Sequence, residues 1–520
     1  MASGVLASGV ALAAGEVASS LIDGVPSPVL SVARVFIDIS PLGLREAAIQ
    51  SLGTGDKPAL IAGVLVVSAL FGALIGLTAR RRPTAATAGI AVFGTIGLVA
   101  AQSDPRATLL GGAFAAVVGV TAGVFTLRAL LSRARPAGVP LTREKDSVAG
   151  RRRVAAAAQA AASAQRRSFL RASGLAAGGM LLGAGIVKAR GLESSNVVTS
   201  SAGPVPEGLT PVSSPLPPVA PGASLEVPGL SPLVTPTADF YRIDTALVVP
   251  KVDARRWKLE VEGMVRNPLR LTLADLSALP QAELDCTIAC VSNEVGGDLV
   301  GTARWQGVPL AALLERAGVD PAASQIMGES VDGFTAGFPI EAGTDGRGAM
   351  LALGMNGAPL TAKHGFPARL IIPGLYGYVS ATKWLSTLRI NRMEDEDGYW
   401  IPRGWSKLGP VKTQCRIDVP GARRLPAGPT PVAGVAWAPT RDIAKVEVQV
   451  NDGPWQEATL GAGLGRNVWR QWAWTWEATP GQHTLRSRAT DGTGAVQTDR
   501  RTAVNPDGAS GYPSRRVQVG

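Results

Sequence analysis

The stretch LDCTIACVSNEVGGDLVG, residues 284–301, contains two of the three cysteines in a chain of 520 residues. Cys286 and Cys290 are four positions apart, and no histidine lies within seventy residues of either. A zinc site would need a second Cys or His pair, and a Cys–His catalytic pair would need a nearby histidine. Taken alone, these cysteines are most simply two small buried side chains. The surrounding sequence must decide whether either of them has a chemical role.

The first 200 residues contain no Trp and are rich in Ala, Gly, Val and Leu. Residues 58–79 form an uncharged run of 22, which is long enough to cross the hydrocarbon core of a bilayer as a helix. Two further spans are expected at 84–102 and 107–132. Residues 1–20 form a weaker candidate, which Glu16 interrupts. The sequence therefore predicts about four transmembrane helices before residue 132.

The net charge of +11 is concentrated in one segment. Between Arg133 and Arg171, ten Lys or Arg residues stand against two acids, Glu144 and Asp146, so this segment carries +8 of the total. Basic segments between apolar spans mark the cytoplasmic side of a membrane, and three arginines at positions 80–82 fit the same rule. This placement argues against nucleic-acid binding. It predicts a multi-pass protein of the cell membrane, with the N-terminus inside and everything after residue 190 outside.

The last span, expected at residues 172–190, follows a pair of arginines. Arg166 and Arg167 begin RRSFLRASGLAAGG, which resembles a twin-arginine export signal, although Gln165 and Arg171 depart from the usual pattern. The alternative is a charged flank that only orients the span. Because the twin-arginine route carries folded proteins, the first interpretation predicts a cofactor-containing domain outside the membrane.

Residues 191–235 are rich in Pro, Ser and Gly and are expected to form an extended, solvated tether. After it, TLADLSAL and PLAALLERAG predict helices, whereas RWKLEVEGMV and ARLIIPG predict strands, which together indicate an α+β domain. From residue 430 onward, short alternating runs with NDG and DGTG turns between them predict a small antiparallel β-sandwich. The expected organisation is transmembrane helices at 1–132, a basic cytoplasmic loop at 133–171, the last transmembrane helix at 172–190, a linker at 191–235, an α+β domain at 236–419 and a β-sandwich at 420–520.

Four segments occur in a fixed order along the α+β domain: CVSNEVGG, GTARWQGVPLAALLERAG, MNGAPLTAKHGFPARLIIPG and GYVSATKWLSTLRI. Together they resemble the sulfite oxidase family of molybdopterin-dependent oxidoreductases. The resemblance covers roughly residues 235–515 and includes a C-terminal part similar to the family's dimerisation domain. It implies a multi-domain fold: an N-terminal α-helical transmembrane bundle, an α+β sulfite-oxidase-type molybdopterin domain and an all-β immunoglobulin-like sandwich.

The resemblance also implies a molybdenum-molybdopterin cofactor. Cys290, in CVSN, matches the family's thiolate ligand to molybdenum, and a soft thiolate is a suitable ligand for such a metal. Cys286 and Cys415 are then expected to be structural. Because the cofactor is anionic, it needs fixed cations, whereas the residues alone show only a polar His364 before a turn and an Arg369 beside a strand. The residues expected to contact the cofactor are Phe240, Tyr241, Arg242, Asp244, Asn293, Asp332, His364, Arg369, Ser380, Thr382 and Lys383.

Two departures from the family pattern bear on the substrate. Sulfite oxidases place arginine directly after C-x-x-Asn, where this chain has Glu294. They also use a catalytic tyrosine at a position where Phe334 aligns, so Phe334 is the expected residue at that catalytic position. An acid beside the metal should repel sulfite, by an amount that depends on its burial. A neutral organic substrate such as a sulfoxide is therefore at least as well supported as sulfite.

The expected function is two-electron oxygen-atom transfer on a small extracytoplasmic substrate, sulfite-like or sulfoxide-like. No histidine precedes His364, so the spans cannot supply a bis-His haem site, and no haem is expected in this chain. Electrons must then pass to a separate carrier, a cytochrome or a quinone-linked protein, and a homodimer through the C-terminal domain is expected. The rival is a non-catalytic membrane-anchored surface binding protein on a degenerate copy of the fold. The missing arginine and tyrosine favour it slightly, whereas Cys290, Arg369 and Lys383 count against it.

Overall fold

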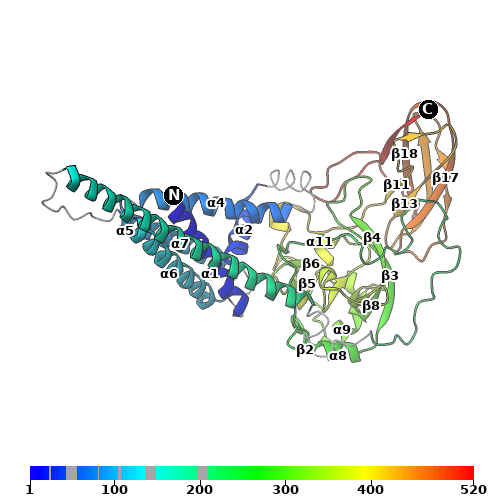
Figure 1. The fold of residues 1–520 in the computed structure, drawn as a ribbon. Helices are drawn as coiled ribbons and strands as arrows, with labels where there is room; N and C mark the ends of the chain where they lie inside the picture. The colour runs from blue at the N-terminus through cyan, green and yellow to red at the C-terminus, as the bar shows by residue number, and fades with distance from the viewer. Residues whose placement is uncertain (23–24, 42–55, 80, 104–106, 135–147, 197–208) are drawn as a thin grey trace. The chain divides into compact units, whose positions relative to one another are not determined.

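The computed structural model of the protein describes residues 1–22, 25–41, 56–79, 81–103, 107–134, 148–196 and 209–520. The chain divides into two compact units, Met1–Val198 and Thr199–Gly520. The first unit is helical and the second is mostly strands (Figure 1).

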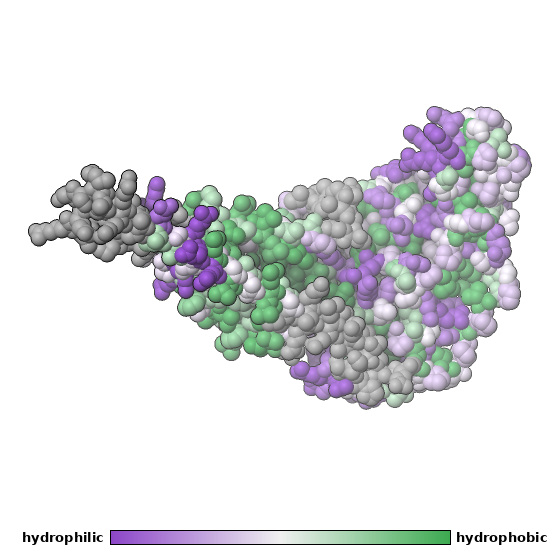
Figure 2. Space-filling model, viewed as in Figure 1, coloured by the Kyte–Doolittle hydropathy of each residue, from purple (hydrophilic) through white to green (hydrophobic). Residues whose placement is uncertain are grey.

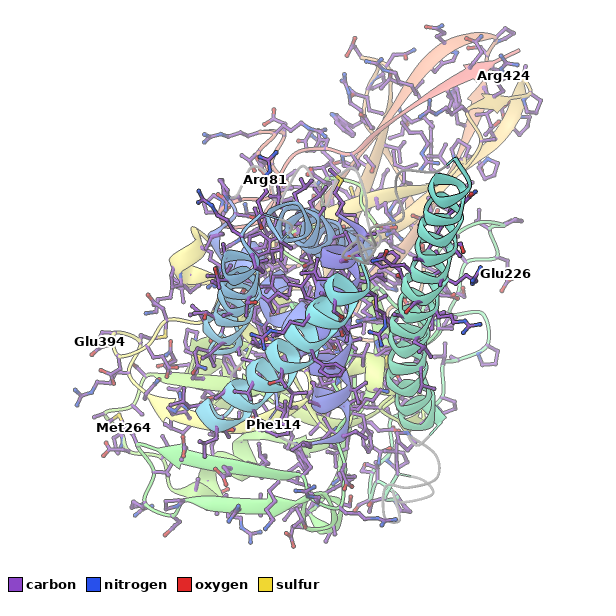
Figure 3. All side chains as sticks on the ribbon, turned by 60° about the vertical axis from the view of Figure 1, so that its left-hand side comes forward. Arg81, Phe114, Glu226, Met264, Glu394 and Arg424 are labelled. Carbon is purple, nitrogen blue, oxygen red and sulfur yellow. The ribbon has the colours of Figure 1, made fainter. Side chains whose placement is uncertain are left out.

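The first unit contains helices whose composition matches the apolar segments of the sequence. They are α1 (Ala2–Leu21), α2 (Pro28–Ile39), α4 (Asp56–Thr78), α5 (Pro83–Ala101), α6 (Leu109–Ala134) and α7 (Val148–Asn196). Among the described residues, four helices are long and apolar enough to cross a membrane: Ala2–Leu21, Lys57–Thr78, Pro83–Ala101 and Leu109–Ala134. The expectation of four apolar helices before residue 132 is thus confirmed by length and composition. Figure 2 shows the apolar surface on these helices, and Phe114 of α6, labelled in Figure 3, is 45% exposed.

Helix α7 differs from the expected loop at 133–171. Residues 148–171 are helical and run without a break into 172–190, because alanine, arginine and glutamine in this stretch favour a helix. The first part of the expected loop, 135–147, lies outside the described residues. The fifth span at 172–190 stays a prediction. The packing of α7 against α1 is consistent with this prediction, since a Cβ added at Gly9 of α1 would lie 2.4 Å from the Met180 sulfur of α7.

Helix α1 packs closely against its neighbours because small residues face one another. A Cβ added at Gly4 would lie 2.0 Å from the Gly72 carbonyl oxygen and 2.4 Å from the Gly76 nitrogen, both in α4. Gly72 and Gly76 form the G-x-x-x-G spacing that lets helices approach to backbone contact. Glu16, which interrupts the first apolar run, accepts hydrogen bonds from the Ser27 hydroxyl at 2.8 Å and the Val29 amide at 3.0 Å. This carboxylate therefore helps to cap the N-terminus of α2.

The second unit begins with an α+β domain built on two sheets. One sheet has the strand order β2-β1-β10-β5-β6, and the other has the order β3-β4-β7-β8, with β9 paired to β7. The strands are β1 (Lys258–Gly263), β2 (Leu269–Thr272), β3 (Ala282–Ala289), β4 (Val300–Pro309), β5 (Gln325–Ser330), β6 (Thr335–Pro339), β7 (Met350–Met355), β8 (Ala358–Pro359), β9 (Arg369–Ile371) and β10 (Leu385–Asn391). The helices and 3-10 turns are α8 (Leu273–Ala278), α9 (Leu310–Ala317), α10 (Glu341–Thr344), η3 (Ala362–His364), α11 (Gly377–Ser380) and η4 (Ile401–Arg403).

The local sequence patterns of this domain correspond to these elements. TLADLSAL forms α8, which starts at a capping box between Thr272 and Asp275, and PLAALLERAG forms α9, which ends at Gly318 in the left-handed conformation. The expected strands correspond to β1 and β9. One apolar core joins both sheets and includes Cys286, which is fully buried.

The C-terminal domain also has two sheets, of order β11-β13-β17-β16 and β12-β19-β18-β14-β15, whose inward side chains form a separate core. Its strands are β11 (Gln414–Val419), β12 (Arg424–Leu425), β13 (Gly428–Trp437), β14 (Ile443–Val450), β15 (Gln456–Glu457), β16 (Thr459–Leu460), β17 (Arg470–Ala478), β18 (Gly481–Asp491) and β19 (Ser514–Val519). The boundary expected near residue 420 lies earlier, because β11 pairs with β13 and places Cys415 in this core. Cys415 contacts the Ser487 hydroxyl at 3.2 Å, as expected for a structural thiol.

Residues 209–235, which we call the strap, do not form the free tether that composition predicted. The Leu216 amide donates to Glu283 at 2.7 Å, and the Leu225 amide donates to Gln471 at 2.9 Å. The strap therefore binds both domains of the second unit. Glu226, labelled in Figure 3, is one of its exposed residues, and residues 197–208 of the predicted linker lie outside the described residues.

Candidate active site

Cys290 lies at the start of the loop between β3 and β4. Its amide donates to the Leu299 carbonyl at 2.9 Å, and the Asn293 side-chain oxygen accepts from the Leu299 amide at 2.9 Å. The loop needs glycine at position 297, because a Cβ there would lie 2.6 Å from that Asn293 oxygen. The paired glycines of the sequence thus let Asn293 brace the loop that presents Cys290.

The Cys290 thiol is 8% exposed, and burial raises its pKa. Hydrogen bonding with Ser292 and the positive charge of Lys383 act in the opposite direction. A bound metal cation would add a much stronger preference for the thiolate, since metal binding displaces the thiol proton. Burial also raises the pKa of the Cys286 thiol, which lies in the core of the domain.

Arg369, at the start of β9, is 5% exposed. Its Nη1 donates to the His364 carbonyl at 3.3 Å, and its guanidinium lies 5.0 Å from the centre of the Trp305 ring. Burial lowers its pKa to about 10, so it stays charged at neutral pH. Within the described residues, no carboxylate pairs with it and its Nε has no hydrogen-bond partner. Because a buried, unpaired charge is costly, Arg369 is suited to bind an anionic ligand.

Lys383 and Arg242 share one carboxylate. The Lys383 Nζ lies 2.8 Å from Asp244 and the Arg242 Nε lies 2.9 Å from it, while the Asp244 side chain is 4% exposed. Burial lowers the pKa of Lys383 to about 8, against the opposing effect of Asp244. Gly365, at φ +107°, permits this arrangement, since a Cβ there would lie 3.0 Å from Lys383 and 3.1 Å from Arg369.

His364 forms a hydrogen bond of 3.0 Å between its Nε2 and the Thr237 carbonyl. Because a carbonyl only accepts, Nε2 carries the proton. Burial, and then the charge of Arg369, lower the pKa of His364 to about 4, so the imidazole is neutral at physiological pH. Its Nδ1 is then an acceptor. His364 therefore offers an acceptor and no positive charge, unlike the fixed cations that an anionic cofactor was expected to need at this position.

Phe240 and Tyr241 complete this side of the site. Their rings are stacked, with centroids 5.3 Å apart, and Phe240 meets the Trp305 and His364 rings edge-on at 5.8 and 5.9 Å. Burial, and then the nearby Cys290, raise the pKa of Tyr241, so its hydroxyl keeps its proton. The structure therefore joins Tyr241, Arg369 and Cys290 in one electrostatic neighbourhood.

Four of the expected residues make hydrogen bonds or ring contacts with other groups of the protein. Asp332 accepts from the Phe334 amide at 3.3 Å in the turn between β5 and β6, and the Phe334 ring lies 5.9 Å from the Tyr399 ring. The Ser380 hydroxyl donates to the Tyr376 carbonyl at 3.0 Å, and that of Thr382 to the Gly328 carbonyl at 3.5 Å. Their contacts with a cofactor stay predictions.

The structure reduces the repulsion expected from Glu294 and reveals a positioning role for Asn356. Glu294 is exposed, so its charge acts through solvent and repels an anion only weakly. Asn356, which sequence reasoning passed over, donates to the Thr235 carbonyl at 3.0 Å and the Thr237 hydroxyl at 3.1 Å. It thereby fixes the segment that leads into Phe240 and Arg242. Its only signal in the sequence was an Asn-Gly pair after an apolar run, which indicates a turn and no more.

The residues present fit an anionic, oxygen-rich cofactor. Two buried N–H groups, Arg369 Nε and Asn293 Nδ2, have no partner among the described residues, and both could donate to oxygen. Arg242, Lys383 and Arg369 carry three positive charges against the one negative charge of Asp244, which leaves a surplus of two. A phosphate monoester carries about 1.5 to 2 negative charges at neutral pH and would balance that surplus.

Comparisons with known proteins agree with this chemistry. Residues 246–400 match the model of the oxidoreductase molybdopterin binding domain. An uncharacterized oxidoreductase, YuiH of Bacillus subtilis, is 34% identical over 176 residues, covering 33% of this chain and 84% of that protein. Mitochondrial sulfite oxidase of Rattus norvegicus is 28% identical, covering 46% of this chain and 52% of the relative, so the chain spans about half the length of that enzyme.

A solved structure shares the fold of just over half of the chain. The sulfane dehydrogenase SoxCD from Paracoccus pantotrophus matches with a TM-score of 0.50 and 24% identity, covering 56% of this chain and 82% of the matched chain. At this identity the likeness concerns the fold alone.

Proposed function

Because the chain belongs to the sulfite oxidase family of molybdopterin-dependent oxidoreductases, we propose that it catalyses two-electron oxygen-atom transfer on a small extracytoplasmic substrate. The observation that carries this proposal is Arg369. It is a buried cation with no carboxylate partner among the described residues, in the same neighbourhood as a buried cysteine. A binding protein without a cofactor would gain nothing from the desolvation that this arginine costs.

The chain's own residues would hold a molybdenum-molybdopterin cofactor from two sides. Cys290 would ligate the metal, and Arg369, Lys383 and Arg242 would bind the anionic part, with Asp244 fixing the positions of the last two. His364 keeps its proton on Nε2, so its Nδ1 would be free to accept a hydrogen bond from the cofactor. When bound, the metal centre supplies the exchange of one oxygen atom and two electrons.

The charge balance favours a neutral substrate. Once a phosphate group has neutralised the surplus of two positive charges, Arg242, Lys383 and Arg369 are matched and do not favour an oxyanion such as sulfite. In the oxidative direction, water supplies the oxygen atom, and two protons and two electrons leave. The reductive direction consumes them and releases water. A separate carrier, a cytochrome or a quinone-linked protein, takes or gives the electrons.

Several features support a membrane location with the catalytic unit outside. Four apolar helices are long enough to span a bilayer, and Leu70 and Val99 on them are 61% and 67% exposed, as lipid-facing side chains would be. The arginines at 81–82 and the basic residues of α7 fit the cytoplasmic side. The two-sheet C-terminal domain is proposed to be immunoglobulin-like and to mediate a homodimer.

The decisive experiment is elemental analysis for molybdenum on the full-length protein, made in a host that synthesises the cofactor. Wild type and Cys286→Ala are expected to contain near-stoichiometric molybdenum. Cys290→Ser is expected to lose the metal or to show an altered metal–sulfur signal by X-ray absorption. Wild type without molybdenum would overturn the proposal and favour the rival, a membrane-anchored surface binding protein on a degenerate copy of the fold.

A further inference from the structure

Tyr241 is expected from the family resemblance to contact the cofactor, and the surroundings of its hydroxyl point to a second role. Its ring is held rather than free, because it stacks on Phe240 with an interplanar angle of 21°. Phe240 is in turn fixed by the edges of the Trp305 and His364 rings. The hydroxyl at the end of the Tyr241 ring therefore has a defined position.

The hydroxyl of Tyr241 is available to donate a hydrogen bond to a ligand. Within the described residues it has no hydrogen-bond partner, whereas two other tyrosines of this domain use theirs. The Tyr378 hydroxyl donates to the Ser406 carbonyl, and the Tyr376 hydroxyl accepts from the Lys412 amide at 3.5 Å. Its stacking partner Phe240 contacts the Trp305 ring, and the Arg369 guanidinium lies 5.0 Å from the centre of that ring. Tyr241 therefore lies on the Arg369 side of the proposed site, and the effects of Arg369 and Cys290 on its pKa agree with this position.

The position expected to carry a catalytic tyrosine holds Phe334, which has no hydroxyl. The Phe334 ring contacts Tyr399 instead, on the side of the domain formed by the turn between β5 and β6. A site that handles an oxygen-bearing substrate still needs a donor for that oxygen, and Tyr241 is a protonated, uncharged donor on the Arg369 side of the proposed site.

We propose that the Tyr241 hydroxyl donates a hydrogen bond to the oxygen atom of a neutral oxide substrate, such as a sulfoxide, and so determines which substrates bind. This inference rests on the proposed function. An uncharged donor suits the charge balance, since the cations of the site are already matched by Asp244 and a cofactor phosphate. A site that donates to a substrate oxygen discriminates against the analogue that lacks it.

The test compares Tyr241→Phe with wild type in the full-length holoenzyme. The change keeps the ring that stacks on Phe240 and removes only the hydroxyl. Two quantities are measured: molybdenum per protein, and the dissociation constant of dimethyl sulfoxide for the oxidised enzyme without reductant, from the visible absorption of the metal centre. Dimethyl sulfide, which lacks the oxygen, is the matched ligand, and Tyr378→Phe is the matched variant.

Tyr241→Phe is expected to retain its molybdenum and to bind dimethyl sulfoxide about tenfold more weakly, the loss expected for one hydrogen bond. Its affinity for dimethyl sulfide and both affinities of Tyr378→Phe should match wild type. Unchanged dimethyl sulfoxide affinity, or binding of sulfite but not of dimethyl sulfoxide, would overturn the role of Tyr241 and leave the molybdenum enzyme standing. Loss of molybdenum from Tyr241→Phe would make it a cofactor-holding residue instead, and wild type without molybdenum would overturn both proposals.

Discussion

Arg369 holds a full charge in the interior, where its hydrogen bond to the His364 carbonyl and its contact with the Trp305 ring are its only described polar contacts. Replacing a buried ion with an apolar side chain of similar size is often neutral or stabilising. The residue therefore serves ligand binding at the expense of the stability of the protein without its cofactor.

Arg369→Met should separate these two effects. Made in a host that lacks the cofactor, the variant should unfold with a free energy equal to wild type or up to about 1–3 kcal/mol higher. Made in a competent host, it should contain much less molybdenum. Denaturant unfolding and elemental analysis measure the two, and Arg255→Met, at an exposed position, should change neither. A destabilised variant with full molybdenum content would contradict this assignment.

His364 gives a pH-dependent signature. Its pKa of about 4 lies below the ordinary 6.5, so between these values the unfolded chain takes up a proton that the folded chain does not. The contribution of this residue to the free energy of unfolding therefore falls as pH falls from 6.5 toward 4. The chain has two histidines, so ¹³C-histidine NMR should show one imidazole that stays neutral down to about pH 5. The signal is assigned to His364 if it is missing from the spectrum of His364→Gln. Titration of this signal near pH 6.5 would refute the prediction.

The turn between β7 and β8 controls the segment that carries Phe240 to Asp244. Asn356 sits there at φ 53°, donates to Thr235 and Thr237, and accepts from the Arg304 amide at 3.0 Å. Its side chain thus ties the end of the strap to the edge of the sheet, close to the bond between His364 and the Thr237 carbonyl.

Asn356→Asp keeps the acceptor, tolerates the positive φ and removes both donors. It should lower the free energy of unfolding of the second unit by about 1–3 kcal/mol and speed molybdenum loss on dialysis. Hydrogen exchange should rise in residues 235–244. Asn267→Asp, which alters an exposed amide with a single long bond of 3.4 Å, is the control. Normal exchange and molybdenum retention in Asn356→Asp would show that the turn does not position the site.

Elements formed by local patterns were predictable from the sequence, and contacts between distant segments were not. The capping box of α8 and the apolar spacing of α9 are each determined by residues that lie within a few positions of one another. The meeting of Cys290, Arg369 and Lys383 depends on segments as much as 93 positions apart, and only the family resemblance suggested it. The strap was missed because a Pro-rich composition is the same for a free tether and for one held by Glu283 and Gln471.

At the scale of the whole molecule, the two units should unfold separately, since each is compact by itself. Gly76→Leu is expected to disrupt the first unit, because a Cβ at Gly76 would lie 2.6 Å from the Met1 carbonyl oxygen. Gly63→Leu, in the same helix, meets nothing within 4 Å and is the control. Calorimetry in detergent should show a lower transition temperature for the helices in Gly76→Leu and an unchanged one for the catalytic unit. A shift of both transitions together would mean that the units are coupled.

The strap also sets an order of events during biogenesis. It is synthesised before the rest of its unit, yet its partners Glu283 and Gln471 leave the ribosome some 70 and 250 residues later. The segment from Thr235 to Asp244 can settle only after its own partners Asn356, His364 and Lys383 have been made, more than 100 residues later. Because Lys383 completes the cluster with Arg242 and Asp244, the membrane helices would be synthesised well before the catalytic unit is ready to receive its metal. The bond from the Leu225 amide to Gln471 would then form after the partners of residues 235–244 are in place.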